Sequence, residues 1–396
     1  MRIPLTDLAA QYTAIKDEID GAVRRVISSG SFILGPEVEA FEQEMAAYCG
    51  TSNAVGVACG TEALQLALLA CGVGPGDEVI TPPFTFIATM EAIVSCGARP
   101  VFVDIEPETF NLDPSLVKQR VSPRTKALLP VHLYGHPCDM TRIMEISRRH
   151  GLKVIEDCAQ ALGASWTGRR VGSFGDAGCL SFFPSKVLGA YGDGGMVVTN
   201  DADVAERVRM LRNHGGRVKY YHEVNGFNSR LDALQAAILR VKLGRLEGWL
   251  ERRRGIAAAY EDGLANIEGI TTPTVADGAV HAFNYYTIRV AGGARRRDAL
   301  ATHLKSQGIA SAVYYPLALH LQAVYRQLGQ APGAFPVEEL AQEAVLSLPI
   351  YPELAGEGTQ EVVQSIRSFF ASDSSRHSRN SARPDSRRHA FNSETP

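Results

Sequence analysis

Three features that would place the chain in a special class are missing from its sequence. No stretch of about eighteen consecutive apolar residues occurs, so no segment is long and apolar enough for a membrane-spanning helix. The residues from Met1 to Asp7 lack the apolar core of a secretory signal peptide. The net charge is only −3, and Lys and Arg are scattered until the last residues, so no basic surface for nucleic acid is indicated. We therefore expect neither a membrane nor a nucleic acid as a partner.

Paired cysteine motifs are missing as well. The seven cysteines contain no CxxC pair, and their number is odd. Together with neighbours typical of buried positions, this indicates reduced thiols in a reducing compartment. We expect a cytoplasmic protein in which no cysteine is catalytic and no metal is bound.

The length and the pattern of apolar segments indicate a two-domain α/β protein. A chain of 396 residues exceeds a single typical core, and 45% hydrophobic with 21% charged residues is ordinary for a globular protein. Apolar strands alternate with helices between residues 54 and 200, which predicts a mostly parallel sheet. The expected strands are 54–58, 78–81, 100–104, 127–131, 154–157 and 195–199.

The remaining segments complete the expected organisation. Residues 12–50 and 232–268 have helical patterns, and a strand at 282–290, a helix at 297–306 and a second strand at 310–316 form a smaller C-terminal domain. We place the large domain at 1–245 and the small domain at 246–371. Residues 372–396 are rich in Ser and Arg with almost no apolar content, which predicts a disordered tail without a chemical role.

Lys186 lies between a short apolar run and a glycine-rich turn. The segment 181–195 reads Ser-Phe-Phe-Pro-Ser-Lys-Val-Leu-Gly-Ala-Tyr-Gly-Asp-Gly-Gly. Glycines let the backbone approach a ligand closely and adopt positive φ. An amine held there could form a Schiff base with an aldehyde cofactor. An ordinary strand end followed by a turn is the alternative interpretation.

Two further segments carry groups that would complement such an amine. Asp157 ends the apolar segment 153–157, and ligands of open α/β sheets bind at the carboxyl ends of strands. A carboxylate there can hold a protonated ring nitrogen, as pyridoxal phosphate requires, although a helix N-cap is the alternative. Gly60 and Thr61 begin a helical pattern, and a helix N-terminus with a hydroxyl suits a phosphate. Thr61 as a simple cap is the alternative there.

In this order, the segments resemble the DegT/DnrJ/EryC1/StrS family of pyridoxal-phosphate-dependent sugar aminotransferases. The resemblance extends from about residue 3 to about residue 370 and includes 30–36, 59–64, 81–89, 156–157, the Lys186 segment and 226–237. It implies a type I PLP-dependent transferase fold of the α/β class, with a mostly parallel sheet in the large domain and a smaller C-terminal α/β domain. It also implies a homodimer with active sites shared across the interface.

The resemblance implies a role for each matching position. Lys186 would form the Schiff base with pyridoxal 5'-phosphate and then move the proton, while Asp157 would hold the pyridinium. The phosphate would be bound at Gly60, Thr61 and Ser181, and by Asn228 of the neighbouring subunit. The cofactor ring would lie against Phe86 and Gln160. Core packing for Phe86 and a turn for Asn228 are the alternatives.

The same resemblance implies the reaction and its substrates. L-glutamate would donate the amino group to a nucleotide-linked keto sugar, in polysaccharide or other amino-sugar biosynthesis. Residues 214–222 with 228–230 resemble the branch that aminates carbon 3 of UDP- or dTDP-linked 3-keto hexoses, with substrate contacts at Arg230, Tyr315 and His320. Arg230 could instead form a structural ion pair. Two departures lie on this side: Asn284 stands where many members have His, and Leu317-Ala-Leu replaces a proline-rich stretch.

Three other functions share some of these sequence features. A 4-keto sugar aminotransferase would share every cofactor residue. A non-catalytic regulator or scaffold with this fold would not need Lys186, Asp157 and Asn228 together. A dinucleotide-binding oxidoreductase is suggested only by 72–77, where an Asp replaces the last glycine of the motif. Lys186 itself favours transamination over dehydration, because the family's dehydratase branch has His at that position.

Overall fold

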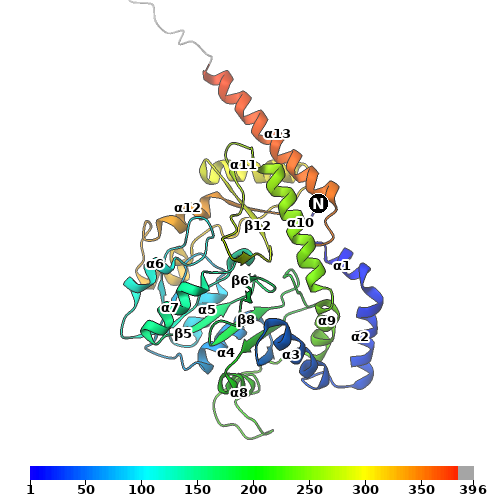
Figure 1. Cartoon of the computed structure of the whole chain (residues 1–396), viewed down its shortest axis with the longest axis vertical. Coiled ribbons are helices and arrows are strands. Elements are labelled where there is room, and N and C mark those ends of the chain that lie inside the picture. Colours follow the sequence, from blue (N-terminus) through cyan, green and yellow to red (C-terminus); the bar gives the residue numbers. More distant parts are fainter. Residues whose placement is uncertain (382–396) are drawn as a thin grey trace, which may run out of the picture.

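The structure is a computed structural model that describes residues 1–381, with side chains described for residues 1–371. A seven-stranded sheet forms the centre of the larger part (Figure 1), in the order β1-β9-β8-β5-β4-β2-β3. All neighbours from β8 to β3 are parallel, whereas β9 is antiparallel to both β1 and β8. The predicted mostly parallel sheet is confirmed. Its strands are β1 (Asn53–Val57), β2 (Glu78–Thr81), β3 (Arg99–Phe102), β4 (Thr125–Leu128), β5 (Lys153–Asp157), β8 (Ala177–Ser181) and β9 (Gly195–Thr199).

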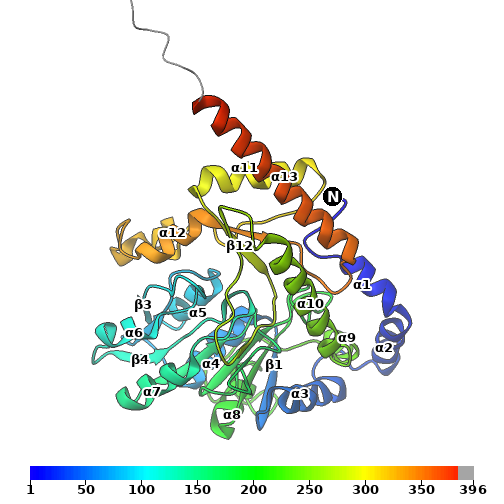
Figure 2. The same ribbon diagram turned by 45° about the horizontal axis from the view of Figure 1, so that its top comes forward.

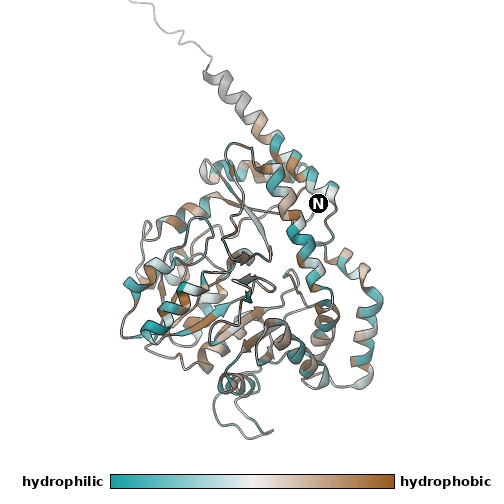
Figure 3. Ribbon diagram, viewed as in Figure 1, coloured by the Kyte–Doolittle hydropathy of each residue, from teal (hydrophilic) through white to brown (hydrophobic). Residues whose placement is uncertain are grey.

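Helices cover both faces of this sheet. One face packs against α4 (Gly60–Ala70), α5 (Ala88–Ser95) and α8 (Ala202–Leu211). The other packs against α2 (Lys16–Ser29), α3 (Pro36–Cys49), α9 (Ala233–Leu243) and α7 (Met140–His150). Figure 3 shows the hydrophobic residues concentrated in the central strands, whereas α2 at the outside is largely hydrophilic. The short elements are α1 (Leu8–Ala14), α6 (Pro114–Val117), η1 (Lys118–Arg120), η2 (Leu133–Gly135), β6 (Ser165–Trp166), β7 (Arg169–Arg170) and β11 (Ala279–Val280).

The alternation of side chains along β5 separates two adjacent carboxylates. Successive residues of a strand point to opposite faces. Ile155 packs in the core beneath α4, whereas Val154 packs against α7. Asp157 therefore shares the α4 face with Ile155, and Glu156 lies on the opposite face. This register is what brings Asp157 toward the N-terminus of α4.

Local signals in the sequence explain where α7 begins and ends. The Asp139 carboxylate accepts a hydrogen bond from the Arg142 N–H at 3.1 Å, which satisfies a free donor of the first turn. The helix ends at Gly151 with a φ of 64°, a left-handed conformation that glycine adopts without strain. The turn at Gly151 leads directly into β5 and so sets the start of the strand that carries Asp157.

A smaller α/β unit lies above the large sheet (Figure 2). Its sheet has the order β10-β12-β13 and is antiparallel. The helix α10 joins the two parts, because Leu250 packs in the core of the large sheet and Tyr260 in the core of the small one. The elements are α10 (Leu246–Leu264), β10 (Ile270–Thr271), β12 (Tyr286–Val290), α11 (Gly293–Ser306), η3 (Leu319–Leu321), η4 (Ala323–Leu328), α12 (Pro336–Ala344), β13 (Val345–Leu348) and α13 (Gly356–Ser381).

Several boundaries differ from the sequence predictions. The second strand predicted at 310–316 is wrong: that segment makes a single bridge, Ala312 to Ser347, and the strand is β13 instead. Ile3 packs in the core of the small unit, although it lies at the start of the predicted large domain. The helix α13 continues through Ser381, into the segment 372–396 predicted to be disordered. The rest of that segment lies outside the described residues. Among residues 1–381, no helix combines the length and the apolar character that crossing a membrane requires.

Candidate active site

A cavity of about 500 Å³ lies at the carboxyl ends of β4, β5 and β8. It brings together residues from both parts of the chain that are far apart in the sequence. The lining residues predicted from the sequence are Gly60, Thr61, Phe86, Asp157, Gln160, Ser181, Lys186 and Tyr315. A larger surface groove of about 630 Å³ runs between α10 and α13, but it holds no lysine and no carboxylate. The smaller cavity is therefore the candidate active site.

Lys186 lies in the loop that follows β8. Its backbone N–H donates to the Phe183 carbonyl at 2.8 Å, and the loop closes through the Phe182 N–H, which donates to the Gly194 carbonyl at 2.8 Å. Burial of the side-chain amine lowers the pKa of Lys186 from its usual 10.5 to about 8, and the charge of Asp157 partly offsets this effect. The amine is thus tuned toward the uncharged form that acts as a nucleophile.

The lowered pKa predicts how Lys186 reacts with an aldehyde. A pKa of about 8 leaves roughly one amine in ten uncharged at pH 7, against roughly one in 3,000 at the usual value. Because only the uncharged amine attacks, we expect the rate of Schiff-base formation between the cofactor-free protein and pyridoxal phosphate to rise from pH 6 and level off above about pH 8. Stopped-flow absorbance across this range measures the rate. A rate that still rises tenfold per pH unit above pH 9 would show that the amine is not tuned.

Asp157 ends β5 with both carboxylate oxygens held in place. One oxygen accepts from the Thr89 hydroxyl at 2.9 Å and the other from the Ala159 N–H at 3.1 Å. Burial raises the pKa of the Asp157 carboxyl, while these two hydrogen bonds and the charge of Lys186 lower it. Each oxygen keeps a lone pair beyond its one bond. A buried, oriented carboxylate of this kind can hold a cation.

The N-terminus of α4 and the end of β8 meet in one corner of the cavity. A Cβ atom added at Gly60 would lie 2.6 Å from the Cβ atom of Ser181, so only glycine lets the strand end lie against the first turn of the helix. Thr61 stands in that same first turn and lines the cavity. Free backbone N–H groups and two hydroxyls at a helix N-terminus form an anion-binding site.

Gln160, Phe86 and Tyr315 also line the cavity and contact one another through Tyr315. The Gln160 amide donates to the Tyr315 hydroxyl at 3.0 Å and accepts from the Tyr134 N–H at 2.7 Å, which fixes its orientation. Burial raises the pKa of the Tyr315 hydroxyl, which therefore stays protonated. Phe86 lies 6.1 Å from the Tyr315 ring and is 54% exposed. A large aromatic ring left open in a cavity offers a face to a planar ligand.

Asn228 and Arg230 do not line the cavity of their own chain. Asn228 is exposed and pairs only through its backbone bridge with Asn213. Arg230 is partly buried, and one of its terminal nitrogens lies 3.4 Å from the Asn213 side-chain oxygen, while its Nε atom is buried without a hydrogen-bond partner. Neither residue reaches the cavity of its own protomer, as expected for Asn228, and the substrate contact of Arg230 stays a prediction.

His320, predicted to contact substrate, lies outside the cavity. Its ring is 1% exposed and packs against Phe102 and Phe335. Its Nε2 atom lies 3.2 Å from a Glu339 carboxylate oxygen, and burial lowers its pKa. The position of His320 depends on how α12 packs against β3, which its sequence neighbourhood does not reveal.

The cavity also contains residues for which the sequence predicted no role. Asp193 and Phe183 belong to the Lys186 loop. They lie near Lys186 in the cavity because the loop turns back to enter β9. The glycine-rich turn around Asp193 was the signal that could have found them. The remaining additional lining residues are Cys59, Leu64, Thr85, Ala88, Val131, Ala159, Ser185, Gly194, Tyr285 and Tyr314.

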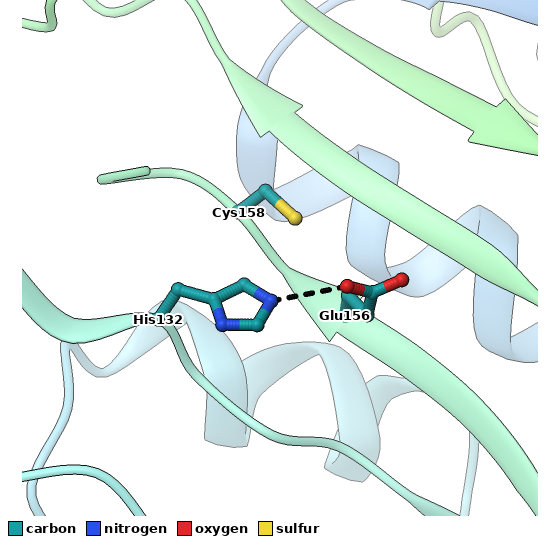
Figure 4. A group of neighbouring side chains, drawn as sticks. All are labelled: His132, Glu156 and Cys158. Atoms are coloured by element: carbon teal, nitrogen blue, oxygen red, sulfur yellow. Dashed lines mark hydrogen bonds and ion pairs between the residues drawn. The ribbon is translucent and has the colours of Figure 1, made fainter. Parts of the chain in front are cut away.

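Among the residues that the structure describes, one buried group of possible metal ligands, His132, Glu156 and Cys158, lies on the other face of β5 (Figure 4). The His132 Nε2 atom is 3.1 Å from a Glu156 oxygen, and its Nδ1 atom accepts from the Cys138 N–H at 2.9 Å. The same carboxylate accepts from the N–H groups of Gly172, Phe174 and Gly175, each at 2.8 Å. Both imidazole nitrogens are thus engaged, Nδ1 with the Cys138 N–H and Nε2 with Glu156. These hydrogen bonds join the segment after β4, the strand β5 and the turn before β8.

Comparisons with known proteins show the family of the chain. A model of the DegT/DnrJ/EryC1/StrS aminotransferase family matches residues 13–367. A pleiotropic regulatory protein of Geobacillus stearothermophilus is 51% identical over 93% of this chain and 99% of its own. The dTDP-3-amino-3,4,6-trideoxy-alpha-D-glucose transaminase of Streptomyces venezuelae is 48% identical over 93% of this chain and 96% of its own.

Two further comparisons extend the series. The UDP-N-acetyl-3-dehydro-alpha-D-glucosamine 3-aminotransferase of Acidithiobacillus ferrooxidans is 47% identical over 92% of this chain and 97% of its own. The crystal structure of S. venezuelae DesV in complex with a ketimine intermediate superimposes with a TM-score of 0.91 at 47% identity. That superposition covers 93% of this chain and 98% of the other.

Proposed function

The chain belongs to the DegT/DnrJ/EryC1/StrS aminotransferase family, and from this premise we propose that it transfers an amino group from L-glutamate to carbon 3 of a UDP- or dTDP-linked 3-keto hexose. That it is a pyridoxal-phosphate-dependent aminotransferase acting on nucleotide sugars follows from its family and close relatives. The choice of carbon 3 is supported by the names of two relatives that share nearly its whole length, a dTDP-3-amino sugar transaminase and a UDP-linked 3-aminotransferase. The observation that carries the chemistry is that Lys186, whose pKa is lowered to about 8 by burial of its amine, shares one cavity with Asp157.

The residues of the cavity fit pyridoxal phosphate. The corner built from Gly60, Thr61 and Ser181 would hold the phosphate, since a Cβ atom at Gly60 would close it. The buried Asp157 carboxylate would hold the protonated ring nitrogen, and the exposed face of Phe86 would cover the ring. When bound there, the cofactor supplies an electron sink that stabilises negative charge on the carbon next to the transferred nitrogen.

The protein's own part in the reaction is to orient the reactants and to move protons. Lys186 is the proposed base that takes the proton from the α-carbon of glutamate, and it returns a proton to the sugar carbon in the second half-reaction. A pKa of about 8 lets the same amine act in both directions near neutral pH. Asp157 would keep the ring nitrogen protonated. Gln160, whose orientation is fixed by its hydrogen bonds with Tyr134 and Tyr315, would hold the cofactor ring in position.

We propose a homodimer in which Asn228 and Arg230 serve the cavity of the partner subunit. Both residues lie outside the cavity of their own chain, and Arg230 has a buried Nε atom without a partner. The segment between α8 and α9 that leads to them projects below α8 (Figure 1) and carries exposed apolar side chains. Contiguous exposed apolar residues are typical of protein interfaces. These side chains are Val218, Tyr220, Tyr221 and Val224.

Mixed dimers test the shared site. We expect the variants Lys186→Ala and Asn228→Ala each to be impaired as homodimers, because every cavity then lacks either its own lysine or the partner's amide. When the two variants are refolded together in equal amounts, about half of the dimers are mixed, and each mixed dimer has one complete cavity out of two. On the order of a quarter of wild-type activity should therefore return. Activity is measured after mixing, with dimer content checked by light scattering. If mixed dimers form and no activity returns, Asn228 acts in its own subunit, whereas an Asn228→Ala homodimer that is as active as the wild type would show that Asn228 has no role.

A panel of keto sugars tests the position of amination. UDP- and dTDP-linked 3-keto and 4-keto hexoses are each offered to the protein after its cofactor has been aminated by glutamate. Our proposal expects amine in the 3-keto product only, at carbon 3 by NMR. Amination of the 4-keto sugars instead would establish the alternative of a 4-keto sugar aminotransferase.

A regulatory role is the alternative from another class, and the name of the Geobacillus relative is the observation that favours it. Such a protein would bind the cofactor without turning over any sugar in the panel. The complete set of Lys186, Asp157 and an open cavity supports catalysis instead. We further propose that the protein works in the cytoplasm and supplies an amino sugar for polysaccharide or related biosynthesis, since its seven cysteines are free thiols, as in reducing compartments.

A further inference from the structure

The helix α9 carries a buried lysine that contacts the Lys186 loop. Lys242 is 0% exposed, and its Nζ atom donates to the Gly189 carbonyl at 2.7 Å. The same nitrogen lies 4.1 Å from the centre of the Tyr191 ring, over its face. Burial lowers the pKa of Lys242 to about 8. A buried amine with these two contacts is held against the loop rather than in solvent.

A second side chain of α9 contacts the same loop. The Gln235 side-chain oxygen accepts from the Tyr191 N–H at 2.9 Å, and its nitrogen donates to the Tyr191 carbonyl at 3.2 Å. Gln235 and Lys242 are seven residues apart, which is two helical turns, so both project from one face of α9. Two anchors on one rigid helix fix the backbone of Gly189 and Tyr191.

The anchored residues Gly189 and Tyr191 are connected to Lys186 by close contacts within the loop. A Cβ atom at Gly189 would lie 2.1 Å from the Pro184 carbonyl oxygen, so the two sides of the loop are in contact. The N–H groups of Lys186 and Ala190 donate to the Phe183 and Phe182 carbonyls, each at 2.8 Å. A tight turn closed by these bonds has little freedom, and a shift at Gly189 displaces Lys186 as well.

We propose that Lys242 is a positioning residue for the aminotransferase reaction: its bond to Gly189 and its contact with Tyr191 hold the loop so that the Lys186 amine faces the cavity. An apolar side chain would fill this buried position without the cost of desolvating an amine. The hydrogen bond and the ring contact of Lys242 are both made with the loop, and the Glu353 charge partly offsets the lowering of its pKa, so the placement of Lys186 explains this lysine better than packing does. The helix α9 packs against α2 and α3, which gives the anchor a firm base. Lys242 does not line the cavity, so it would act only through the loop.

Three variants test the proposal. Lys242→Met keeps the volume and removes the donor, whereas Lys242→Gln keeps a donor without the charge. Leu300→Ala, in the core of the small unit, is the control for a general loss of stability, because Leu300 is buried far along the chain from the loop. Amide hydrogen exchange of residues 182–194 is measured with and without the cofactor, and the rate of the glutamate half-reaction is measured by stopped flow.

The expected result separates positioning from stability. Lys242→Met should speed exchange in 182–194 by about tenfold even without the cofactor, and slow the half-reaction by about 10- to 100-fold. Lys242→Gln should bring the exchange rate and the half-reaction rate most of the way back to their wild-type values. Leu300→Ala should lower Tm while leaving these two rates unchanged. The proposal would be overturned if Lys242→Met exchanged and reacted at wild-type rates. It would also be overturned if Leu300→Ala, at the same Tm as Lys242→Met, changed the exchange rate and the half-reaction rate by the same factors. If Lys242→Met does not fold, Gln235→Leu is read by the same criteria, because it removes the second anchor of the same turn.

Discussion

Replacing Lys186 with alanine is expected to lower the turnover of the aminotransferase by about 10⁴-fold, the upper range for removing a positioned acid–base group. The variant keeps Asp157 and the N-terminus of α4, so it should still bind pyridoxal phosphate and the amino sugar. It lacks the amine that moves the proton in both half-reactions. Single-turnover kinetics with glutamate measure the loss directly.

A small amine provides the control for this variant. Methylamine added to Lys186→Ala can enter the space left by the side chain and take over the proton transfer, so part of the rate should return with amine concentration. Lys186→Arg keeps a positive charge but has no usable base, because its guanidinium stays protonated, and should remain inactive. Turnover of Lys186→Ala within tenfold of the wild type would mean that another group moves the proton.

Replacing Asp157 with asparagine is expected to lower the rate of both half-reactions by about 10²- to 10³-fold, comparable to the loss of one preorganised electrostatic contact in other enzymes. A neutral amide cannot stabilise the positive ring nitrogen, and without that charge the cofactor draws electrons less strongly. The side chain is isosteric and buried, so the fold should persist. The rate of the glutamate half-reaction and the dissociation constant of the cofactor are both measured.

Thr89→Val is the matched control for the Asp157 variant. It removes the hydroxyl that donates to the Asp157 carboxylate at 2.9 Å but leaves the negative charge. We expect a loss of about tenfold, since one hydrogen bond to a charged group contributes about 1.5 kcal/mol. Equal losses in the two variants would show that the orientation of Asp157 matters and its charge does not. An unchanged rate in Asp157→Asn would remove the carboxylate from the mechanism.

Much of the fold and the cofactor side of the site follows from local patterns. The apolar segments 153–157 and 195–199 became the strands β5 and β9, and Gly60 begins α4 as its sequence indicates. Asp157 and Lys186 lie in one cavity because Asp157 ends β5 and Lys186 follows β8, and the carboxyl ends of these two neighbouring strands meet at one edge of the sheet. These predictions succeeded because each rests on a short stretch of chain and on one rule of sheet geometry.

What the sequence left open or placed elsewhere depends on contacts between distant segments. The antiparallel direction of β9 is set by its pairing with β1 and β8, which no local pattern encodes. Likewise the strand beside β12 is β13, because Tyr286 pairs with Leu348 rather than with the nearer segment 310–316. His320 lies in a buried cluster instead of the cavity for the same reason. The anchor at Lys242 gave no sequence signal, since a lysine in a helix is ordinarily exposed.

The measurement that tests the account most directly is the visible absorbance spectrum of the purified protein with pyridoxal phosphate, before and after L-glutamate. We expect a yellow band from the cofactor joined to Lys186, absent in Lys186→Ala. We also expect that glutamate bleaches this band and that one 2-oxoglutarate is released for each site. A band that glutamate leaves unchanged would contradict the proposed donor. No band at all would contradict the cofactor site built around Lys186 and Asp157.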